Sequence, residues 1–504
     1  YEEMGYMHAV PMGGDLTRTK ENQTPGFMFS AARDPLGANL DRVQIVKGWL
    51  DRNGKTHEKV YDVGWAGDRS IEQETGKLPP IGSTVNFEDA SYDNSIGGDS
   101  ISGVWFDPDF DANLPSFYYC RVIEIPRPRW TLKDSIFFGI KGDNFNGNDF
   151  VIDALKNGSR LAVTDDENPK FSDNPNIIKV PDALIVLQKL SRFHRKNSNA
   201  KVIGITGSNG KTTTKELIFK VLSSKFKTIC SLGNFNNHIG LPLSLLEIRN
   251  DTEFAIIEMG ANNFGEIEFL TSLCEPDYGY ITNFGKAHLE GFINLDGVIK
   301  AKTELYDWII ENDKVLLING EDKTQNKFAN HKSIVFGSGN NCNYTFNEGN
   351  KELVHVLFEE FLFKTNLYGS YNYSNVCAAI ALGLEFGLDK NEINQTLVDY
   401  NSENNRSEII RINGKTIILD AYNANPSSME EAIKSFSKFK GEKAIILGDM
   451  YELGKESSTE HKNIIKLCEE IPNSRCIFIG EHFYIFSNTN KGSKFFKNKT
   501  DFYN

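Results

Sequence analysis

The chain has 504 residues, and 39% of them are hydrophobic, which is ordinary for a globular protein of about three or four domains. Its 68 acidic residues outnumber 55 lysines and arginines, so the net charge is −13 and neither nucleic acid nor an anionic membrane is expected as a partner. Seven cysteines without CxxC spacing predict reduced thiols, no zinc site and a cytoplasmic protein. No apolar run is long enough to span a membrane, and because the chain begins at Tyr1 without a signal peptide, we expect its true N-terminus to be missing.

Residues 1–130 predict a β-rich module. Strand-like runs at 43–46, 57–63 and 117–125 alternate with turns such as 52–54, which is typical of a partial sandwich. We expect this module to fold apart from the rest of the chain, because its texture differs from the α/β pattern that follows.

Two segments of this module carry a resemblance. Residues 34–48 and 115–130 resemble the C-terminal end of a bacterial family of uncharacterised function, whose main body looks like a metal-dependent hydrolase and is absent from this sequence. The acidic run at 107–111 allows either a cation site or a turn, and a turn is the favoured interpretation.

The sequence pattern changes after Trp130, from a β-rich pattern to alternating strands and helices. Residues 131–198 predict a small α/β unit that ends in a helix over 182–195. Strands then alternate with helices over 199–403, which is the pattern of a parallel sheet with crossover helices. The predicted fold class is therefore α/β.

A second and smaller βα series occupies residues 404–504. Its expected strands lie at 416–420, 443–447 and 476–479, with no obvious final strand after them. The late lysines predict a solvated tail; they are Lys491, Lys494, Lys497 and Lys499.

A phosphate loop is the most informative segment of the chain. Residues 204–214 read Gly-Ile-Thr-Gly-Ser-Asn-Gly-Lys-Thr-Thr-Thr between a strand at 201–205 and a helix at 213–222. A glycine-rich turn before a helix directs backbone N–H groups at a phosphate. Lys211 can then reach a β- or γ-phosphate and the Thr212 hydroxyl can bind Mg²⁺. The alternative is a simple tight turn, which has no use for a Lys-Thr pair.

Three polar residues downstream are candidates for the same site. Glu258 ends a buried strand and is expected to bind Mg²⁺ opposite Thr212, the alternative being an acid in solvent. His288 follows a strand predicted to end at Asn283, and either metal ligation or a structural role is open for it. Lys302 lies on a helix, where a lysine alone predicts only solvent exposure.

Nine segments together resemble the Mur ligase family. Two of them, Asp-Ala-Tyr-Asn-Ala-Asn-Pro and Leu-Gly-Asp-Met-Tyr-Glu-Leu-Gly, are similar to the member that adds D-alanyl-D-alanine to a UDP-N-acetylmuramoyl-tripeptide, and separate it from its sister ligases. The likeness covers about residues 132–504. The segments occur in family order at 207–213, 233–243, 258–261, 283–291, 302–304, 369–375, 405–408, 420–426 and 447–454.

The resemblance implies a central ATP-binding domain and a Rossmann-like C-terminal domain, with ATP and Mg²⁺ as cofactors. It implies a carboxylate activated as an acyl phosphate and then attacked by an amine. Lys302 would be carbamylated, and His288 would hold a second Mg²⁺. Metal binding is expected at Thr212, Glu258 and His288, and catalysis at Lys211, His288 and Lys302. The nucleotide is expected at Gly207, Ser208, Asn209, Gly210, Lys211, Thr212, Thr213, Asn372, Asn375, Arg406 and Asp420.

The expected partners are the UDP-N-acetylmuramoyl-tripeptide and D-alanyl-D-alanine, and we expect a monomer. The substrate residues that the resemblance implies are Asn236, Asn237, Asn423, Asn425 and Asp449.

The sequence departs from this family at both ends. The Asp-Ser/Thr-Arg motif that helps to hold the uridine nucleotide is missing upstream of Leu132, and so is a late Lys-Gly-Ser-Arg strand. Three hypotheses follow: an active cell-wall peptide ligase, a folate polyglutamate ligase, or a non-catalytic fusion that binds ATP. The segments 423–425 and 448–450 argue against the folate ligase. The missing motif predicts weak binding of UDP-muramoyl peptides.

Overall fold

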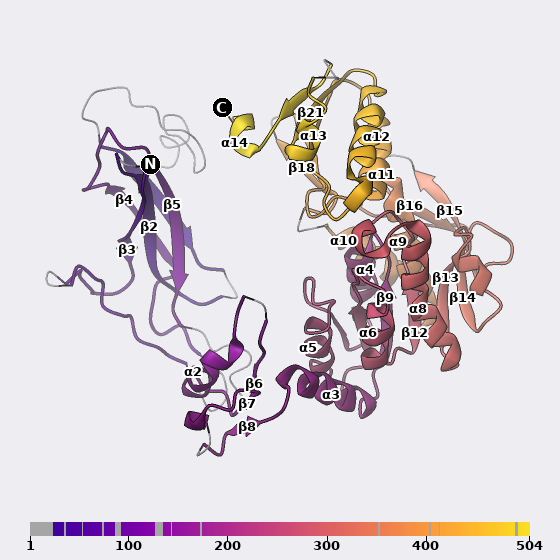
Figure 1. Cartoon of the computed structure of the whole chain (residues 1–504), viewed down its shortest axis with the longest axis horizontal. Helices are drawn as coiled ribbons and strands as arrows, with labels where there is room; N and C mark the ends of the chain where they lie inside the picture. The colour runs from indigo at the N-terminus through magenta and orange to yellow at the C-terminus, as the bar shows by residue number, and fades with distance from the viewer. Residues whose placement is uncertain are drawn as a thin grey trace. The chain divides into compact units, whose positions relative to one another are not determined.

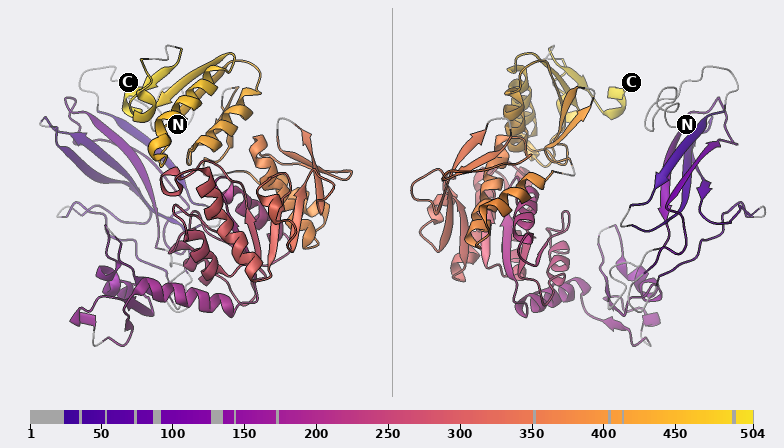
Figure 2. Two further views of the ribbon diagram at one scale, coloured as in Figure 1. Left: turned by 45° about the vertical axis from the view of Figure 1, so that its right-hand side comes forward. Right: turned by 180° about the vertical axis from the view of Figure 1, so that it is seen from behind.

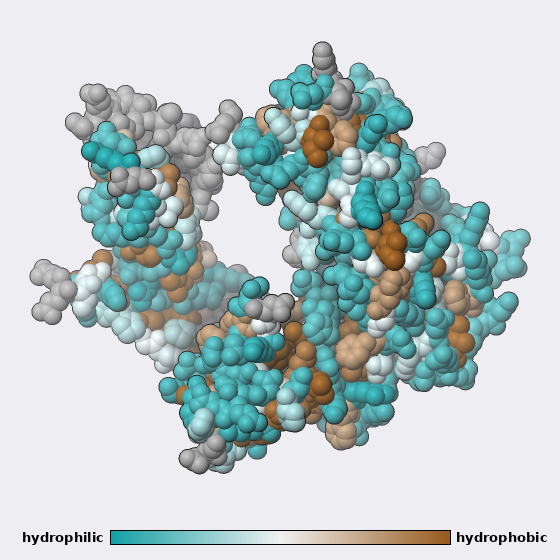
Figure 3. All heavy atoms as spheres, viewed as in Figure 1, coloured by the Kyte–Doolittle hydropathy of each residue, from teal (hydrophilic) through white to brown (hydrophobic). Residues whose placement is uncertain are grey.

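The computed structural model describes two compact units, residues 1–183 and 184–504, which are treated separately below. Within the described residues, no helix is both long and apolar enough to cross a membrane. Hydrophilic residues dominate the face shown in Figure 3. The described residues are 24–503 without 35–36, 53, 73–74, 86–91, 127–134, 143, 172–173, 351–352, 403–404, 413 and 489–491.

The first unit opens with two small antiparallel sheets (Figure 1). β2 (Leu40–Leu50) lies between β3 (Thr56–Trp65) and β5 (Ser116–Glu124), and β1 (Gly26–Ala32) pairs with β4 (Ser100–Phe106). The prediction of a β-rich module is thus confirmed, with strands longer than expected. The buried core between the sheets consists of Leu40, Val43, Ala66 and Ile101.

The acidic run at 107–111 forms a hydrogen-bonded turn. The buried Asp107 carboxylate accepts from Lys47 Nζ and from the Tyr118 hydroxyl, each at 2.6 Å. Asp109 accepts from the Tyr61 hydroxyl at 2.7 Å. Among the described residues, no group of three or more His, Cys, Asp or Glu side chains could hold a metal ion. The carboxylates bind the protein's own donors, which supports the turn.

The rest of the first unit is a small parallel sheet. It consists of β6 (Ile136–Gly139), β7 (Leu161–Thr164) and β8 (Ile177–Lys179), with α2 (Val151–Lys156) against it. The predicted boundary at Trp130 lies outside the described residues.

A nine-stranded sheet forms the centre of the second unit (Figures 1 and 2). Its strands run parallel from β10 through β15, as predicted, but β15, β16 and β17 form antiparallel pairs that the sequence interpretation missed. Their order is β10 (Thr228–Cys230), β11 (Phe254–Glu258), β9 (Lys201–Thr206), β12 (Tyr278–Ile281), β13 (Val315–Asn319), β14 (Ser333–Gly337), β15 (Tyr344–Asn350), β16 (His355–Phe358) and β17 (Phe361–Phe363).

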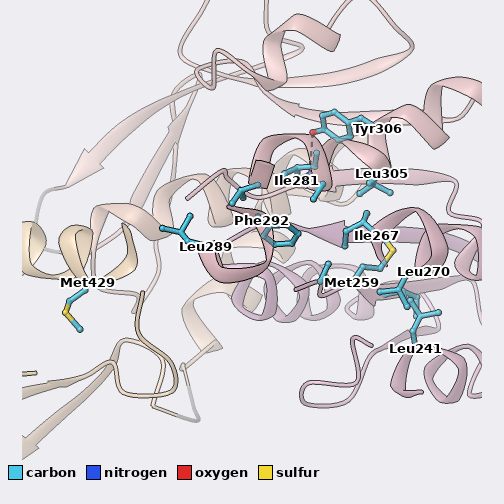
Figure 4. Close-up of a cluster of buried hydrophobic side chains, with 14 of the residues drawn as sticks. Leu241, Met259, Ile267, Leu270, Ile281, Leu289, Phe292, Leu305, Tyr306 and Met429 are labelled. Atoms are coloured by element: carbon cyan, nitrogen blue, oxygen red, sulfur yellow. Dashed lines mark hydrogen bonds between the residues drawn. The ribbon is translucent and has the colours of Figure 1, made fainter. Parts of the chain in front are cut away.

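Helices cover both faces of this sheet. Leu241, Ile267 and Leu305 come from three helices of one face and pack together with Met259, as Figure 4 shows. The helices of that face are α5 (Gly240–Leu246), α6 (Glu266–Cys274) and α8 (Leu295–Glu311), and those of the other are α4 (Lys211–Ser223), α9 (Tyr373–Glu385) and α10 (Lys390–Asp399). In the chain, α3 (Ala183–Lys196) precedes the first strand of the sheet, and α7 (Leu289–Phe292) precedes α8.

The last domain contains two sheets. β18 (Glu408–Ile412) and β19 (Lys415–Leu419) form an antiparallel pair, whereas β20 (Lys443–Gly448), β21 (Ser474–Ile479) and β22 (Lys494–Phe496) run parallel. The expectation that the strand near 416–420 belongs to the βα series is therefore wrong. The helices are α11 (Pro426–Ser437), α12 (Ser457–Glu469), α13 (Glu481–Tyr484) and α14 (Lys499–Tyr503).

Lys494, Lys497 and Lys499 of the predicted solvated tail are exposed, and Lys491 lies outside the described residues. The segment is nevertheless structured, because Lys494–Phe496 form β22. Phe495 stacks on Phe478 with ring centroids 5.1 Å apart, and Phe496 contacts Phe502 of α14. These contacts partly bury the two phenylalanines, which the lysine-rich composition of the segment did not indicate.

Candidate functional site

The phosphate loop joins β9 to α4 in a conformation that requires glycine. Gly207 has φ +140°, and a Cβ there would lie 2.0 Å from Thr282 Oγ1. Gly210 has φ +77°, and its Cβ would lie 2.8 Å from Asn375 Oδ1. An added side chain would be strained and would clash, so both glycines fix the path of the turn.

Residues after β12 hold this loop in place. The Thr282 hydroxyl and the Asn283 amide both donate to the Asn209 carbonyl, at 2.5 and 2.9 Å. The Asn283 side-chain oxygen also accepts from Asn209 N at 3.0 Å. β12 ends at Ile281, two residues before the predicted end, which frees Asn283 for this contact. Sequence reasoning gave neither Thr282 nor Asn283 a role.

Lys211 is half-buried at the first position of α4. Its ammonium donates to the carbonyls of Gly207 at 2.8 Å and Ser208 at 3.2 Å, so it lies across the loop. Burial lowers the pKa of Lys211, with the nearby Arg406 acting in the same direction. The cation and the N-terminus of α4 thus point to the place where a phosphate is expected.

Thr212 and Glu258 form an oxygen pair beside the loop. The Thr212 hydroxyl donates to Glu258 Oε2 at 3.0 Å, and the Asn236 amide donates to Oε1 at 2.9 Å. Glu258 is only 2% exposed. Mg²⁺ takes one or two carboxylates together with phosphates and water, so this hydroxyl and carboxylate fit that ion.

His288 and Lys302 both lie beside the Phe292 ring. His288 pairs with Glu452 of the last domain, and burial lowers its pKa. Lys302 is buried on α8, with its ammonium 5.3 Å from the Phe292 ring. Burial lowers the pKa of Lys302 to about 7, and the charge of Lys211 contributes. A second metal at His288 remains a prediction, since no three-residue metal cluster occurs among the described side chains.

The last domain contacts the loop directly. The Asn425 amide donates to Asn209 Oδ1 at 2.6 Å. Asn425 also caps α11, because its side chain accepts from Ser428 N at 2.9 Å. Nearby, Lys286 pairs with Glu460 of α12 at 2.7 Å. Asn425 therefore joins the phosphate loop to the start of a helix in another domain.

Arg406 and Asp420 lie beside aromatic residues. The Arg406 guanidinium lies 3.6 Å from the centre of the Tyr422 ring. The Tyr371 hydroxyl donates to Asp420 Oδ2 at 3.3 Å and bonds to the Ser407 hydroxyl at 2.7 Å. Tyr371 and Tyr422 were not predicted as site residues, although both lie inside recognised segments.

Asn372 and Asn375 are buried behind the loop. The Asn375 amide donates to Asn372 Oδ1, and its oxygen accepts from the Thr214 hydroxyl, both at 3.0 Å. The Asn372 amide donates to the Tyr368 carbonyl at 2.8 Å. These amides therefore support α4 from α9. Contact of Asn372 and Asn375 with the nucleotide stays a prediction.

Two further expected substrate residues support helix starts, as Asn425 does at α11. The Asp449 carboxylate accepts from the amides of His482 at 2.9 Å and Phe483 at 3.0 Å, at the first turn of α13. Asn237 Oδ1 accepts from Gly240 N at the start of α5. Asn423 is exposed and accepts from the next amide. Direct contact of these side chains with a substrate is untested.

Comparisons with known proteins agree with this architecture. Residues 205–383 match the Mur ligase middle domain, and residues 405–484 match the Mur ligase glutamate ligase domain. Residues 1–151 match a protein family of unknown function (DUF3604), which confirms that resemblance and extends it beyond residue 130.

Individual relatives identify the kind of Mur ligase more specifically than the domain matches do. A UDP-N-acetylmuramoyl-tripeptide–D-alanyl-D-alanine ligase of Bacillus subtilis (strain 168) is 36% identical over 334 residues, which are 65% of this chain and 73% of the relative. The crystal structure of MurF from Acinetobacter baumannii has 29% identity and a TM-score of 0.66, covering 73% of this chain and 82% of that one. MurF ligase from Thermotoga maritima, in complex with ADP, shares the fold at 23% identity and a TM-score of 0.63, over 73% and 92% of the two chains.

A parallel-sheet domain with this phosphate loop, followed by a second α/β domain, defines a Mur ligase. Because the Bacillus relative is similar over most of its length, the chain belongs to the family of UDP-N-acetylmuramoyl-tripeptide–D-alanyl-D-alanine ligases, also called MurF. The family prediction made from the nine segments is confirmed.

Proposed function

We propose that this protein joins D-alanyl-D-alanine to a UDP-N-acetylmuramoyl-tripeptide with consumption of ATP. The observation that carries the proposal is the constellation of Lys211, Thr212 and Glu258 at the loop of a MurF family member. The Thermotoga ligase, whose fold this chain shares, is a complex with ADP, which supports the use of an adenine nucleotide. A cytoplasmic location and a monomeric state remain predictions.

The loop residues would orient the nucleotide. Phosphoryl transfer needs charge neutralised at the transferred group and reactants held in line, with little covalent help from the protein. The α4 N-terminus and Lys211 supply fixed positive charge, while Thr212 and Glu258 would hold one Mg²⁺. That ion, when bound, supplies further charge at the phosphates.

Residues of the last domain would complete the site. The Asn425–Asn209 and Lys286–Glu460 contacts hold this domain against the loop. Such an arrangement would keep water away from an acyl phosphate, which hydrolysis would otherwise destroy. Asn423 and Asn425 are the residues that we expect to face the dipeptide.

Lys302 would act as a carbamate. A carbamate converts a buried cation into a carboxylate-like anion, which suits a position near metal and phosphate charge. The reaction needs a neutral amine, and a pKa of about 7 leaves much of Lys302 neutral at physiological pH.

A second candidate is a fusion that binds ATP without using the UDP substrate. The match of residues 1–151 to a different family favours it, since this match reaches into residues 131–198, which the Mur ligase resemblance predicts to be a partial UDP-substrate domain. The described part of that segment contains the three-stranded sheet of β6, β7 and β8 together with α2 and α3.

Phosphate release with each substrate omitted in turn separates the two candidates. The ligase requires ATP, Mg²⁺, the UDP-linked tripeptide and D-alanyl-D-alanine together. Phosphate release that ignores both peptide substrates supports the second candidate.

A further inference from the structure

Lys215 is a buried lysine that the proposed mechanism does not use. It lies on α4 one turn after Lys211 and is 1% exposed. Its ammonium donates to the Gly233 carbonyl at 3.0 Å and lies 3.6 Å from Glu258 Oε2. Burying a charge is costly unless it is paired and hydrogen-bonded, so both contacts are needed to keep this side chain in place.

Glu258 is the acid that balances Lys215. The thiol of Cys230 also lies nearby, but burial raises its pKa to about 11 and keeps it neutral. The Asn236 amide donates to Oε1 of Glu258, and the Thr212 hydroxyl shares Oε2 with the Lys215 ammonium. Both carboxylate oxygens of Glu258 therefore accept hydrogen bonds from neighbouring side chains.

The same contacts connect Glu258 to a loop. Gly233 and Asn236 belong to the segment between β10 and α5, and one bonds to Lys215 while the other bonds to Glu258. The start of this segment is also fixed, because Glu258 N donates to the Ser231 hydroxyl at 3.2 Å. Lys215 therefore closes a ring of contacts through α4, β11 and this loop.

We propose that Lys215 is a positioning residue that orients the Glu258 carboxylate for a divalent cation bound with the nucleotide. The proposal rests on the proposed use of ATP and Mg²⁺ at this site. Residues that orient a metal ligand typically change metal affinity by about 10- to 100-fold when they are removed. Replacing Lys215 alone leaves Glu258 buried without its partner, which costs stability whatever the role of the lysine. A purely structural role would leave the gain in ADP affinity from Mg²⁺ unchanged in a folded variant, so that gain is the readout.

The test compares ADP affinity with excess Mg²⁺ and with EDTA by titration calorimetry. For Lys215→Met we expect the gain in affinity from Mg²⁺ to fall about tenfold or more, with ADP binding in EDTA unchanged. Lys215→Arg, which keeps the charge and the donors, should retain most of the gain. Lys220→Met is the matched control, because Lys220 is exposed on the same helix.

A folded Lys215→Met protein with the wild-type response to Mg²⁺ would overturn the proposal. Lys215→Gln is the second variant if methionine prevents folding, since it keeps a donor for Gly233 and removes the charge; the same unchanged response there also overturns it. Absence of ADP binding by the wild type would instead contradict the proposed function.

Discussion

At the scale of single residues, the substitution of Lys211 is expected to have the most direct effect on ATP turnover. The Lys211 ammonium donates hydrogen bonds to two carbonyls of the loop. When a nucleotide binds, its phosphate would replace these carbonyls as the partner of the ammonium. We expect Lys211→Ala to lose about 3 kcal/mol of transition-state stabilisation, or roughly 100-fold in kcat/KM. Steady-state ATP turnover checks this, with Lys220→Ala as the control. Wild-type turnover in Lys211→Ala would refute the assignment of the loop.

Carbamylation of Lys302 is expected to depend on pH. The folded-state pKa of Lys302, about 7, lies below its ordinary value of 10.5, so the amine becomes neutral as the pH rises through 7. We expect isotopically labelled bicarbonate to give a carbamate NMR signal that grows above pH 7 and is lost in acid. Lys302→Gln should lack this signal. The same absence in the wild type at alkaline pH would disprove carbamylation.

At the scale of elements, the turn between β9 and α4 depends on a glycine that no side chain can replace. Gly207→Ala would place a Cβ 2.0 Å from Thr282 Oγ1, at a φ that L-residues avoid. We expect a loss of about 1–3 kcal/mol in unfolding free energy and weaker ADP binding. Chemical denaturation and calorimetry measure both.

Gly265→Ala is the control for that substitution. Gly265 also has a positive φ, of +79°, but nothing lies within 4 Å of its added Cβ. It should cost less stability and leave ADP binding intact. Equal losses in both variants would show that backbone strain, and not the contact with Thr282, determines the effect.

The sequence predicts elements that depend on local signals and misses those that depend on distant contacts. The loop at 204–214 and the acid at the end of β11 follow from glycine spacing and an apolar run. Thr282 and Asn283 support the loop from a neighbouring strand, which no local pattern reveals. β22 was missed because its stability comes from stacking between Phe495 and Phe478.

At the scale of the whole molecule, the division into residues 1–183 and 184–504 predicts separate unfolding. A ligand stabilises only the unit that binds it, by RT ln(1 + [L]/Kd). Scanning calorimetry should therefore show two transitions, and ADP with Mg²⁺ should raise the temperature of one. A single transition that moves as a whole would contradict this.

Both Mur ligase domain matches lie in the second unit, whereas binding of the UDP-linked tripeptide depends on a motif expected in the first unit. The sequence predicts weak affinity for the UDP-linked tripeptide because the uridine motif is missing upstream of Leu132. Titration calorimetry with that tripeptide tests the prediction, and micromolar affinity would show that other residues supply the missing contacts.

Mass analysis of the UDP-linked product tests the central claim most directly. The protein is incubated with ATP, Mg²⁺, the UDP-N-acetylmuramoyl-tripeptide and D-alanyl-D-alanine. We predict a product heavier than the tripeptide by one dipeptide less one water, formed in equal amount with ADP and reduced roughly 100-fold in rate by Lys211→Ala. Nucleotide binding without any such product would contradict the account and support the fusion that binds ATP alone.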